Sequence, residues 1–185
     1  MRSAALRRTT PGRKDATHER IVGAAARAIR RSGYGGTGVA EIMKDAGLTH
    51  GGFYAHFASR EAAEGLAALE RVAGAAAPRR ALPALLRAYL SRAHVEGVET
   101  GCAVAALGSE MPRQAPGVRR AATRRIKEMI DLVARQSPDW GRPGAHQHAL
   151  VTVATMVGAL VLARAVDDPQ LSDAVREAAL EHLTP

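Results

Sequence analysis

From residue 60 onward, every periodic stretch of this sequence has the spacing of an α-helix. Apolar side chains recur every three or four residues, and no stretch of useful length alternates apolar and polar residues as a half-buried strand does. Proline and glycine separate the stretches, as they commonly do between helices. The sequence therefore predicts an all-α fold, with helices over 60–76, 80–96, 101–111, 115–136, 144–166 and 170–183.

The composition agrees with close-packed helices. Only 3% of the 185 residues are aromatic, whereas 46% are hydrophobic, so the core must consist mainly of small aliphatic side chains. One cysteine excludes an internal disulfide framework and a four-cysteine zinc site. Residues 1–14 are basic but contain no apolar run, so we expect no secretory signal and a cytoplasmic location.

The net charge of +8 is concentrated at the N-terminal end. Residues 1–60 contain eleven basic and four acidic residues and therefore carry +7 of this charge. A basic block on a nearly neutral body indicates an end that binds nucleic acid or an anionic membrane. The plain alternative is a solvated basic tail.

Short helices and glycines follow the basic arm. An amphipathic helix begins at Thr17, with inward apolar residues such as Ile29, and Gly33 is a plausible stop for it. Thr37 and Thr49 are suitable N-caps for two short helices, and Gly47 lies in the turn between them. Two short helices joined by a glycine turn predict a helix-turn-helix.

The second of these short helices has an unusual face. Gly51 and Gly52 cost roughly 2 kcal/mol of helix propensity relative to two alanines. A broken local rule in an otherwise consistent segment indicates function. If Phe53 and Phe57 point inward, the outer face carries almost no side chains and can lie deep in a DNA groove. The charge and this helix together favour DNA as the partner.

Residues 33–62, GYGGTGVAEIMKDAGLTHGGFYAHFASREA, resemble the DNA-binding signature of the TetR family of transcriptional regulators. Two later segments, GCAVAALGSEM and MVGALVLARAVDDPQLSD, resemble a C-terminal subtype of that family. The resemblance implies an N-terminal three-helix domain with a helix-turn-helix at about 38–57, and a C-terminal helical bundle for ligand binding and dimerisation. The expected boundaries are 1–14 for a disordered basic arm, 15–62 for the DNA-binding domain and 63–185 for the bundle.

The resemblance also implies which side chains meet DNA. A tyrosine hydroxyl and an arginine can bind phosphate, and a histidine ring can bind a phosphate or a base edge. The plain alternatives are a packing role for Tyr54 and a surface position for His56. The residues expected at phosphates are Thr37, Thr49, Tyr54 and Arg60, and those expected at or beside base edges are His50, Gly51, Gly52 and His56.

Residues 149–166 form an almost uninterrupted apolar run. The run is too short and too rich in alanine, threonine and glycine for a convincing membrane span, so no membrane partner is expected. A fully buried helix remains possible, but a helix with one face in the core and another on a second subunit fits better. The resemblance implies a homodimer built from the last two long helices, and hence a palindromic operator. The expected interface residues are Leu150, Ala154, Val157, Gly158, Val161 and Leu162.

The effector site is less clearly marked. We expect an apolar small molecule, with His94, Cys102, Met111, Met129 and Met156 as candidate pocket residues. Cys102, at the start of a predicted helix, is either a small packing residue or a sensor of oxidants or electrophiles. His146 and His148 are not neighbours on a helix face, so neither a metal site nor another cofactor is expected.

The sequence thus predicts a TetR-like repressor that a small-molecule effector releases from its double-stranded DNA operator. The alternatives are an activator, an effector-independent DNA-binding protein, or a thiol-based sensor acting through Cys102. No enzyme is expected, because a glycine-rich phosphate loop, paired carboxylates and a nucleophile triad are absent from the sequence.

Overall fold

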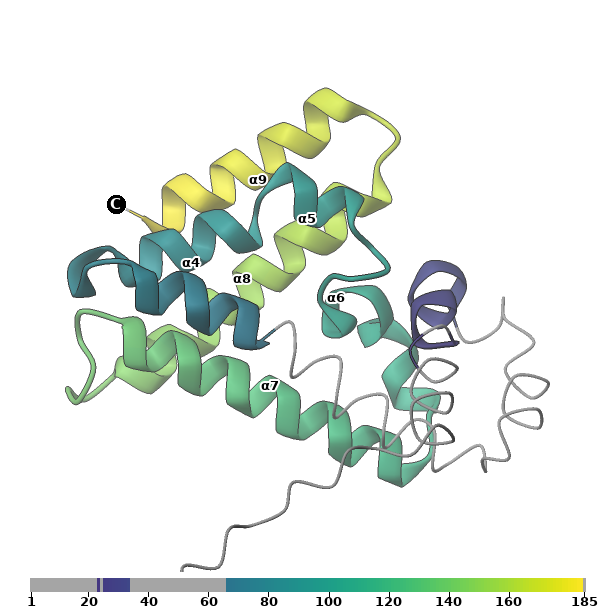
Figure 1. Cartoon of the computed structure of the whole chain (residues 1–185), viewed down its shortest axis with the longest axis horizontal. Coiled ribbons are helices and arrows are strands. Elements are labelled where there is room, and N and C mark those ends of the chain that lie inside the picture. Colours follow the sequence, from purple (N-terminus) through teal and green to yellow (C-terminus); the bar gives the residue numbers. More distant parts are fainter. Residues whose placement is uncertain (1–22, 24, 34–65, 185) are drawn as a thin grey trace, which may run out of the picture.

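The structure, a computed structural model, describes residues 23, 25–33 and 66–184 (Figure 1). Within this part the secondary structure is helical and contains no strand, which confirms the all-α prediction. Two helical stretches, 25–33 and 66–75, come first. The later elements are η1 (Pro78–Arg80), α4 (Ala81–Tyr89), α5 (Arg92–Glu96), α6 (Ala103–Leu107), η2 (Gly108–Arg113), α7 (Pro116–Gln136), α8 (Ala145–Ala165) and α9 (Pro169–Leu183).

The three long C-terminal helices begin and end within one residue of their predicted ranges. Proline at the first helical position starts α7 and α9, where a missing N–H group costs nothing. The Asp168 carboxylate caps α9 by accepting hydrogen bonds from the N–H groups of Gln170 and Leu171, at 2.8 and 3.2 Å. Proline therefore marks the starts of α7 and α9, and the Asp168 cap adds to the start of α9.

The structure differs from the sequence prediction over 80–96, where one helix was expected and two form. Ser91 is extended, with φ −70° and ψ 153°, and its hydroxyl accepts a hydrogen bond from the N–H of His94 at 3.2 Å. This cap starts α5 in a new direction. The break brings the His94 ring against the Tyr89 ring, with centroids 4.7 Å apart and planes at 88°.

The predicted helix over 101–111 is also divided. Its first part is α6, which ends at Leu107, and its second part is the 3-10 helix η2, which begins at Gly108 and has Pro112 near its end. A proline lacks the N–H group and fits poorly in a helix interior, so a continuous α-helix through this region is disfavoured.

The core of the C-terminal body lies between α4, α7 and α8. Leu85, Leu86 and Tyr89 on α4 are almost completely buried, and so are Met156 and Leu160 on α8. Tyr89 is the one aromatic side chain among the buried core residues of the described part. The remaining buried residues are aliphatic, several of them alanines, as the low aromatic content indicated.

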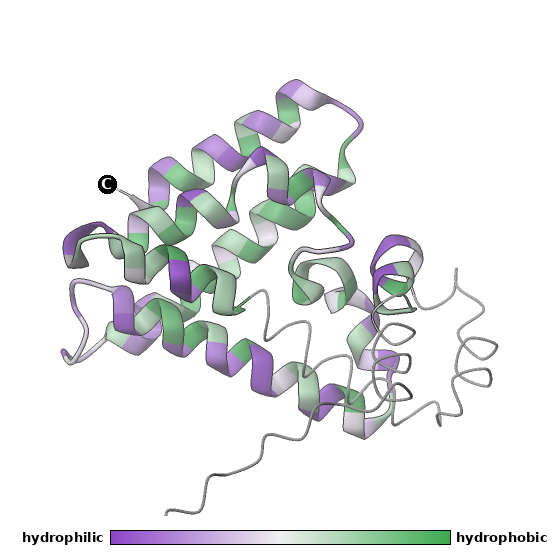
Figure 2. Ribbon diagram, viewed as in Figure 1, coloured by the Kyte–Doolittle hydropathy of each residue, from purple (hydrophilic) through white to green (hydrophobic). Residues whose placement is uncertain are grey.

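Helix α8 is mostly apolar along its length (Figure 2). It packs against α7 and α9, and by length and composition alone it could cross a membrane. Seven of its residues are nevertheless buried within this body. Four of its large aliphatic residues are exposed: Leu150, Val151, Val161 and Leu162 are 43%, 59%, 41% and 56% exposed.

The helical stretch 25–33 buries Ala25 and Ile29, as predicted, and also Ala26, which was not expected on the inward face. Gly33, with φ +69°, ends the stretch in the left-handed conformation that a C-terminal glycine adopts. Arg30, in the last turn of this stretch, is only 6% exposed although it is charged. This end of the helix packs against the body, since a Cβ at Gly33 would lie 2.7 Å from a Glu110 carboxylate oxygen.

Candidate functional site

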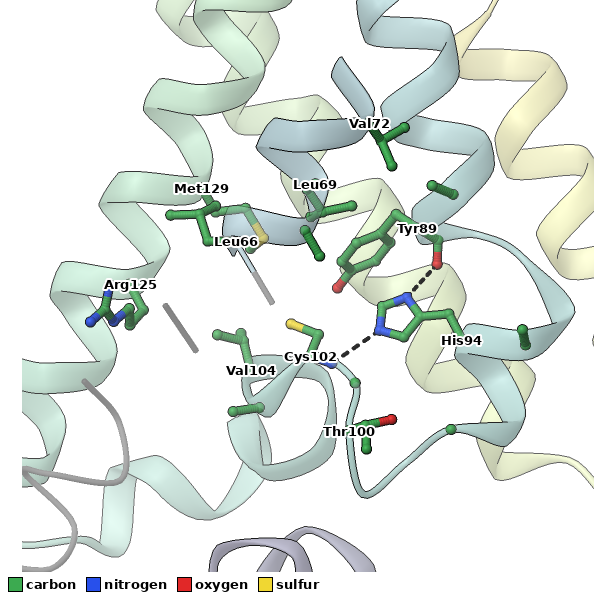
Figure 3. Close-up of a pocket in the computed structure, with 16 residues that line it drawn as sticks. Leu66, Leu69, Val72, Tyr89, His94, Thr100, Cys102, Val104, Arg125 and Met129 are labelled. Atoms are coloured by element: carbon green, nitrogen blue, oxygen red, sulfur yellow. Dashed lines mark hydrogen bonds between the residues drawn. The ribbon is translucent and has the colours of Figure 1, made fainter. Parts of the chain in front are cut away.

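A cavity of about 260 Å³ lies between the helical stretch 66–75, α4, α7 and the segment that joins α5 to α6 (Figure 3). Its walls are mainly apolar, so the cavity suits the body of an apolar molecule. The larger apolar side chains that line it are Leu66, Leu69, Val72, Val104 and Met129.

His94 fixes the wall between α5 and α6. Its Nδ1 atom lies 2.6 Å from the Tyr89 carbonyl oxygen, and its Nε2 atom accepts a hydrogen bond from the Cys102 N–H at 3.0 Å (Figure 3). This pattern requires a neutral ring with the proton on Nδ1. Burial lowers the pKa of His94, and the charge of Arg164 lowers it further, although the bond to Tyr89 opposes the shift. The ring therefore acts as a fixed bridge between α4 and Cys102.

The Tyr89 hydroxyl points into the cavity, toward Cys102 (Figure 3). The side chain is 1% exposed, and its hydroxyl makes no hydrogen bond within the described part of the chain. Burial raises the pKa of Tyr89 well above its ordinary value, and the nearby Cys102 thiol raises it further. Tyr89 thus presents a neutral hydroxyl that can still donate a hydrogen bond.

Arg164 attaches the same wall to α8. Its Nη2 atom donates to the His94 carbonyl oxygen at 2.6 Å, and its Nε atom donates to the Val95 carbonyl oxygen at 3.2 Å. The packing is tight: a Cβ at Gly101 would lie 2.7 Å from Arg164 Nη2 and 2.8 Å from the Gly97 carbonyl oxygen. Gly101 thus lies directly against the Arg164 side chain of α8, and a larger residue there would collide with it.

The cavity wall also contacts the N-terminal helical stretch. Glu99, within the segment 97–102, accepts a hydrogen bond from Arg31 Nη1 at 2.9 Å. The pair is exposed, so its contribution to stability is small, on the order of 0–1 kcal/mol. One short segment thus lines the cavity, packs against α8 and contacts the helical stretch 25–33. We call residues 97–102 the relay segment.

The structure brings together part of the predicted pocket. His94, Cys102 and Met129 line the cavity, whereas Met156 lies in the core with 0% exposure and Met111 lies in η2. Cys102 is a free, half-buried cysteine, and its role as a sensor stays a prediction. Tyr89 was not singled out from the sequence, because a tyrosine at a helical core position gives no signal that its hydroxyl faces a cavity.

The predicted DNA-binding and dimer residues have different outcomes. The eight residues expected at DNA, from Thr37 to Arg60, lie outside the described residues. Of the six residues expected at the dimer interface, four are exposed on α8, Val157 and Gly158 are half-buried, and Val157 packs against the core; the interface itself stays a prediction. Val151, which is 59% exposed, adjoins this face and was not among the predicted residues.

Two family models match this chain and show which family it belongs to. Residues 21–62 match the model described as "Bacterial regulatory proteins, tetR family". Residues 78–178, more than half of the chain, match "Transcriptional regulator LmrA/YxaF-like, C-terminal domain". The chain belongs to the TetR family. It is a DNA-binding transcriptional regulator, as the helix-turn-helix signature predicted, and regulators of the TetR family are generally non-enzymatic proteins that bind operator DNA, dimerise and respond to small molecules.

Solved structures of TetR-family regulators have the same fold. A regulator from Agrobacterium tumefaciens is 20% identical, with a TM-score of 0.73 over 93% of this chain and 100% of the other. The reduced form of Escherichia coli NemR is 21% identical, with a TM-score of 0.72 over 91% and 95%. A regulator from Chloroflexus aurantiacus J-10-FL is 25% identical, with a TM-score of 0.67 over 92% and 96%. No curated protein matches the chain.

Proposed function

We propose that this protein is a cytoplasmic homodimeric repressor that leaves a palindromic operator when a small molecule binds in the cavity beside Tyr89. The observation that carries the proposal is the relay segment, 97–102, which lines the cavity and contacts Arg31 through Glu99. A ligand that displaces this segment acts on both the N-terminal helical stretch and α8. Release then follows from the ligand's preference for one of two arrangements of the dimer.

The exposed face of α8 supports the proposed dimer. Four large aliphatic side chains, at positions 150, 151, 161 and 162, are each more than 40% exposed on one helix. A patch of this kind on a protein surface marks an interaction site. Burying it against a second copy gives an isologous interface, with each α8 facing its counterpart.

Two recognition helices in a dimer bind half-sites about one turn of DNA apart. The proposed phosphate contacts from Tyr54 and Arg60 and base-edge contacts from His50 and the two following glycines would then occur twice per operator. This arrangement predicts a strong salt dependence, because each phosphate contact releases counterions.

The experiment measures binding of the full-length protein to its own upstream intergenic DNA over a range of salt concentrations. We expect Tyr54→Phe and Arg60→Ala each to weaken binding. For Arg60→Ala the slope of log affinity against log salt should fall by about two per dimer, one contact per protomer. Arg142→Ala is the matched control, since it removes the same charge from the exposed α7–α8 loop.

Two outcomes would contradict the proposed contacts. One is an unchanged affinity in both Tyr54→Phe and Arg60→Ala, and the other is an Arg60→Ala slope equal to that of Arg142→Ala. A reporter fused to the bound promoter separates repression from activation, since deletion of the regulator raises expression in the first case and lowers it in the second.

A further inference from the structure

We propose that the cavity beside Tyr89 binds a neutral, mostly apolar molecule whose single acceptor oxygen takes a hydrogen bond from the Tyr89 hydroxyl. This inference names the chemical class of the effector and in that respect rests on the proposed function. The binding itself does not depend on DNA, so the two can be tested separately.

The size of the cavity limits the size of the molecule. A cavity of about 150 Å³ in another protein takes up benzene. The present cavity measures about 260 Å³, so it holds roughly ten non-hydrogen atoms. Its large side chains, among them Leu69, Val104 and Met129, are apolar, and burial of an apolar body against them drives binding. A single ring with a short substituent fits these limits.

The charges around the cavity favour a neutral molecule. Arg125 is the one charged residue among the described lining residues, and it forms an ion pair with Glu128. Arg164 lines a separate hollow beside α9 and donates to backbone carbonyl groups. A buried cation would therefore lose its hydration without gaining a counter-charge, which is strongly unfavourable, and a buried anion would have to compete with Glu128 for Arg125.

The Tyr89 hydroxyl sets the position and polarity of the oxygen. It is buried, faces the cavity and makes no hydrogen bond within the described part. A buried hydroxyl without a partner is unfavourable, and a ligand oxygen would supply the missing acceptor. Two further groups do not compete for this role. The Cys102 thiol is a weak acceptor, and both nitrogens of His94 are engaged with backbone groups (Figure 3).

The positive charge of Arg164 favours a ligand group that accepts a hydrogen bond from Tyr89 over one that donates. Arg164 carries a positive charge behind this wall, where it donates hydrogen bonds to the His94 and Val95 carbonyl oxygens next to Tyr89. The negative end of a carbonyl dipole is therefore favoured at the hydroxyl, whereas a ligand N–H group is not. An aryl ketone combines the required ring, size and acceptor.

The test titrates four probes of nearly equal size into the full-length protein by calorimetry, without DNA. They are propiophenone, propylbenzene, 3-phenylpropanoate and 3-phenylpropylammonium, which differ in one polar group. We expect propiophenone to bind about five-fold more tightly than propylbenzene, as one neutral hydrogen bond predicts. The two charged probes should bind more weakly than propiophenone.

Two hydroxyl deletions identify the donor. Tyr89→Phe should remove the preference for propiophenone and leave propylbenzene binding unchanged. Thr100→Val is the matched control, because it deletes another hydroxyl at the cavity wall and should leave the preference intact. Val104→Trp should weaken all four probes by filling the cavity. Tyr89→Phe should fold at least as well as the wild type, because the deleted hydroxyl has no partner in the described part.

Three outcomes would overturn the proposal: no probe binds, a charged probe binds more tightly than propiophenone, or the ketone preference survives in Tyr89→Phe. Failure of the proposed function looks different. In that case propiophenone binds with the expected Tyr89 dependence, but the protein does not bind operator DNA or does not leave it when the probe is added.

Discussion

Gly101→Ala tests the tight packing of the relay segment against α8. The new Cβ would lie 2.7 Å from Arg164 Nη2 and 2.8 Å from both the Gly97 carbonyl oxygen and the His94 Cδ2 atom. Favourable contacts of carbon atoms lie at about 3.5–4.0 Å, so these neighbours must move by roughly 0.7 Å or more. One neighbour is a backbone carbonyl and another is a ring held by two hydrogen bonds, so neither moves freely.

The expected destabilisation follows from these contacts. Overpacking costs about 1–3 kcal/mol, and the smaller unfolded-state entropy of alanine offsets about 0.4–1 kcal/mol of it. We therefore expect a net loss of about 1–2 kcal/mol, which lowers Tm by roughly 2–8 °C in a protein of this size. Thermal unfolding followed by circular dichroism at a fixed protein concentration measures this change.

Gly108→Ala is the control for Gly101→Ala. Gly108 has helical dihedral angles, with φ −56° and ψ −40°, and a Cβ there would meet no atom within 4 Å. This substitution should raise Tm by a few degrees, through about 0.4–1 kcal/mol of unfolded-state entropy. If Gly101→Ala raised Tm as Gly108→Ala does, the segment between α5 and α6 would not be tightly packed around Gly101.

Two further predictions concern the dimer and the histidine bridge. Leu162→Asp, on the exposed face of α8, should give a monomer in sedimentation velocity, because a charge would be buried in the interface. Ile126→Asp, which places the same charge on α7, is the control and should leave the dimer intact. A dimeric Leu162→Asp protein would show that this face of α8 is not the dimer interface. The pKa of His94 is lower in the folded protein than in the unfolded chain, so on acidification the unfolded chain binds a proton at His94 before the folded protein does. The wild type should therefore lose stability as the pH falls from about 6.5 through the lower pKa of the folded state. Unfolding between pH 8 and pH 5 should show a shallower loss in His94→Gln, and equal slopes would mean that His94 does not couple folding to pH.

Much of the fold followed from local signals. Proline and glycine positions and an aspartate cap defined α7, α8 and α9, because helix ends depend on a few neighbouring residues. The split between α4 and α5 was missed, because the Ser91 cap interrupts a stretch whose apolar periodicity continues across it. The buried position of Arg30 was missed as well, since one helix considered by itself does not reveal a second packing surface.

For the candidate site, too, the sequence predicted what depends on residue type but not what depends on the packing of distant helices. The sequence marked His94, Cys102 and Met129 as pocket candidates by residue type, and these three line the cavity. It included Met111 and Met156 on the same ground, although the structure places them in η2 and in the core. Residue type states what a side chain can do, but the packing of distant helices decides which surface it reaches.

By itself, the sequence determined that this protein is helical, that its positive charge lies in the first third of the chain, and that a helix-turn-helix signature belongs to that region. These properties depend on composition and on spacing between near neighbours. Tertiary structure alone decided that the Tyr89 hydroxyl faces a cavity, and that residues 97–102 join this cavity to Arg164 and to Arg31. Such contacts link residues more than sixty positions apart, and a local pattern carries no information about them.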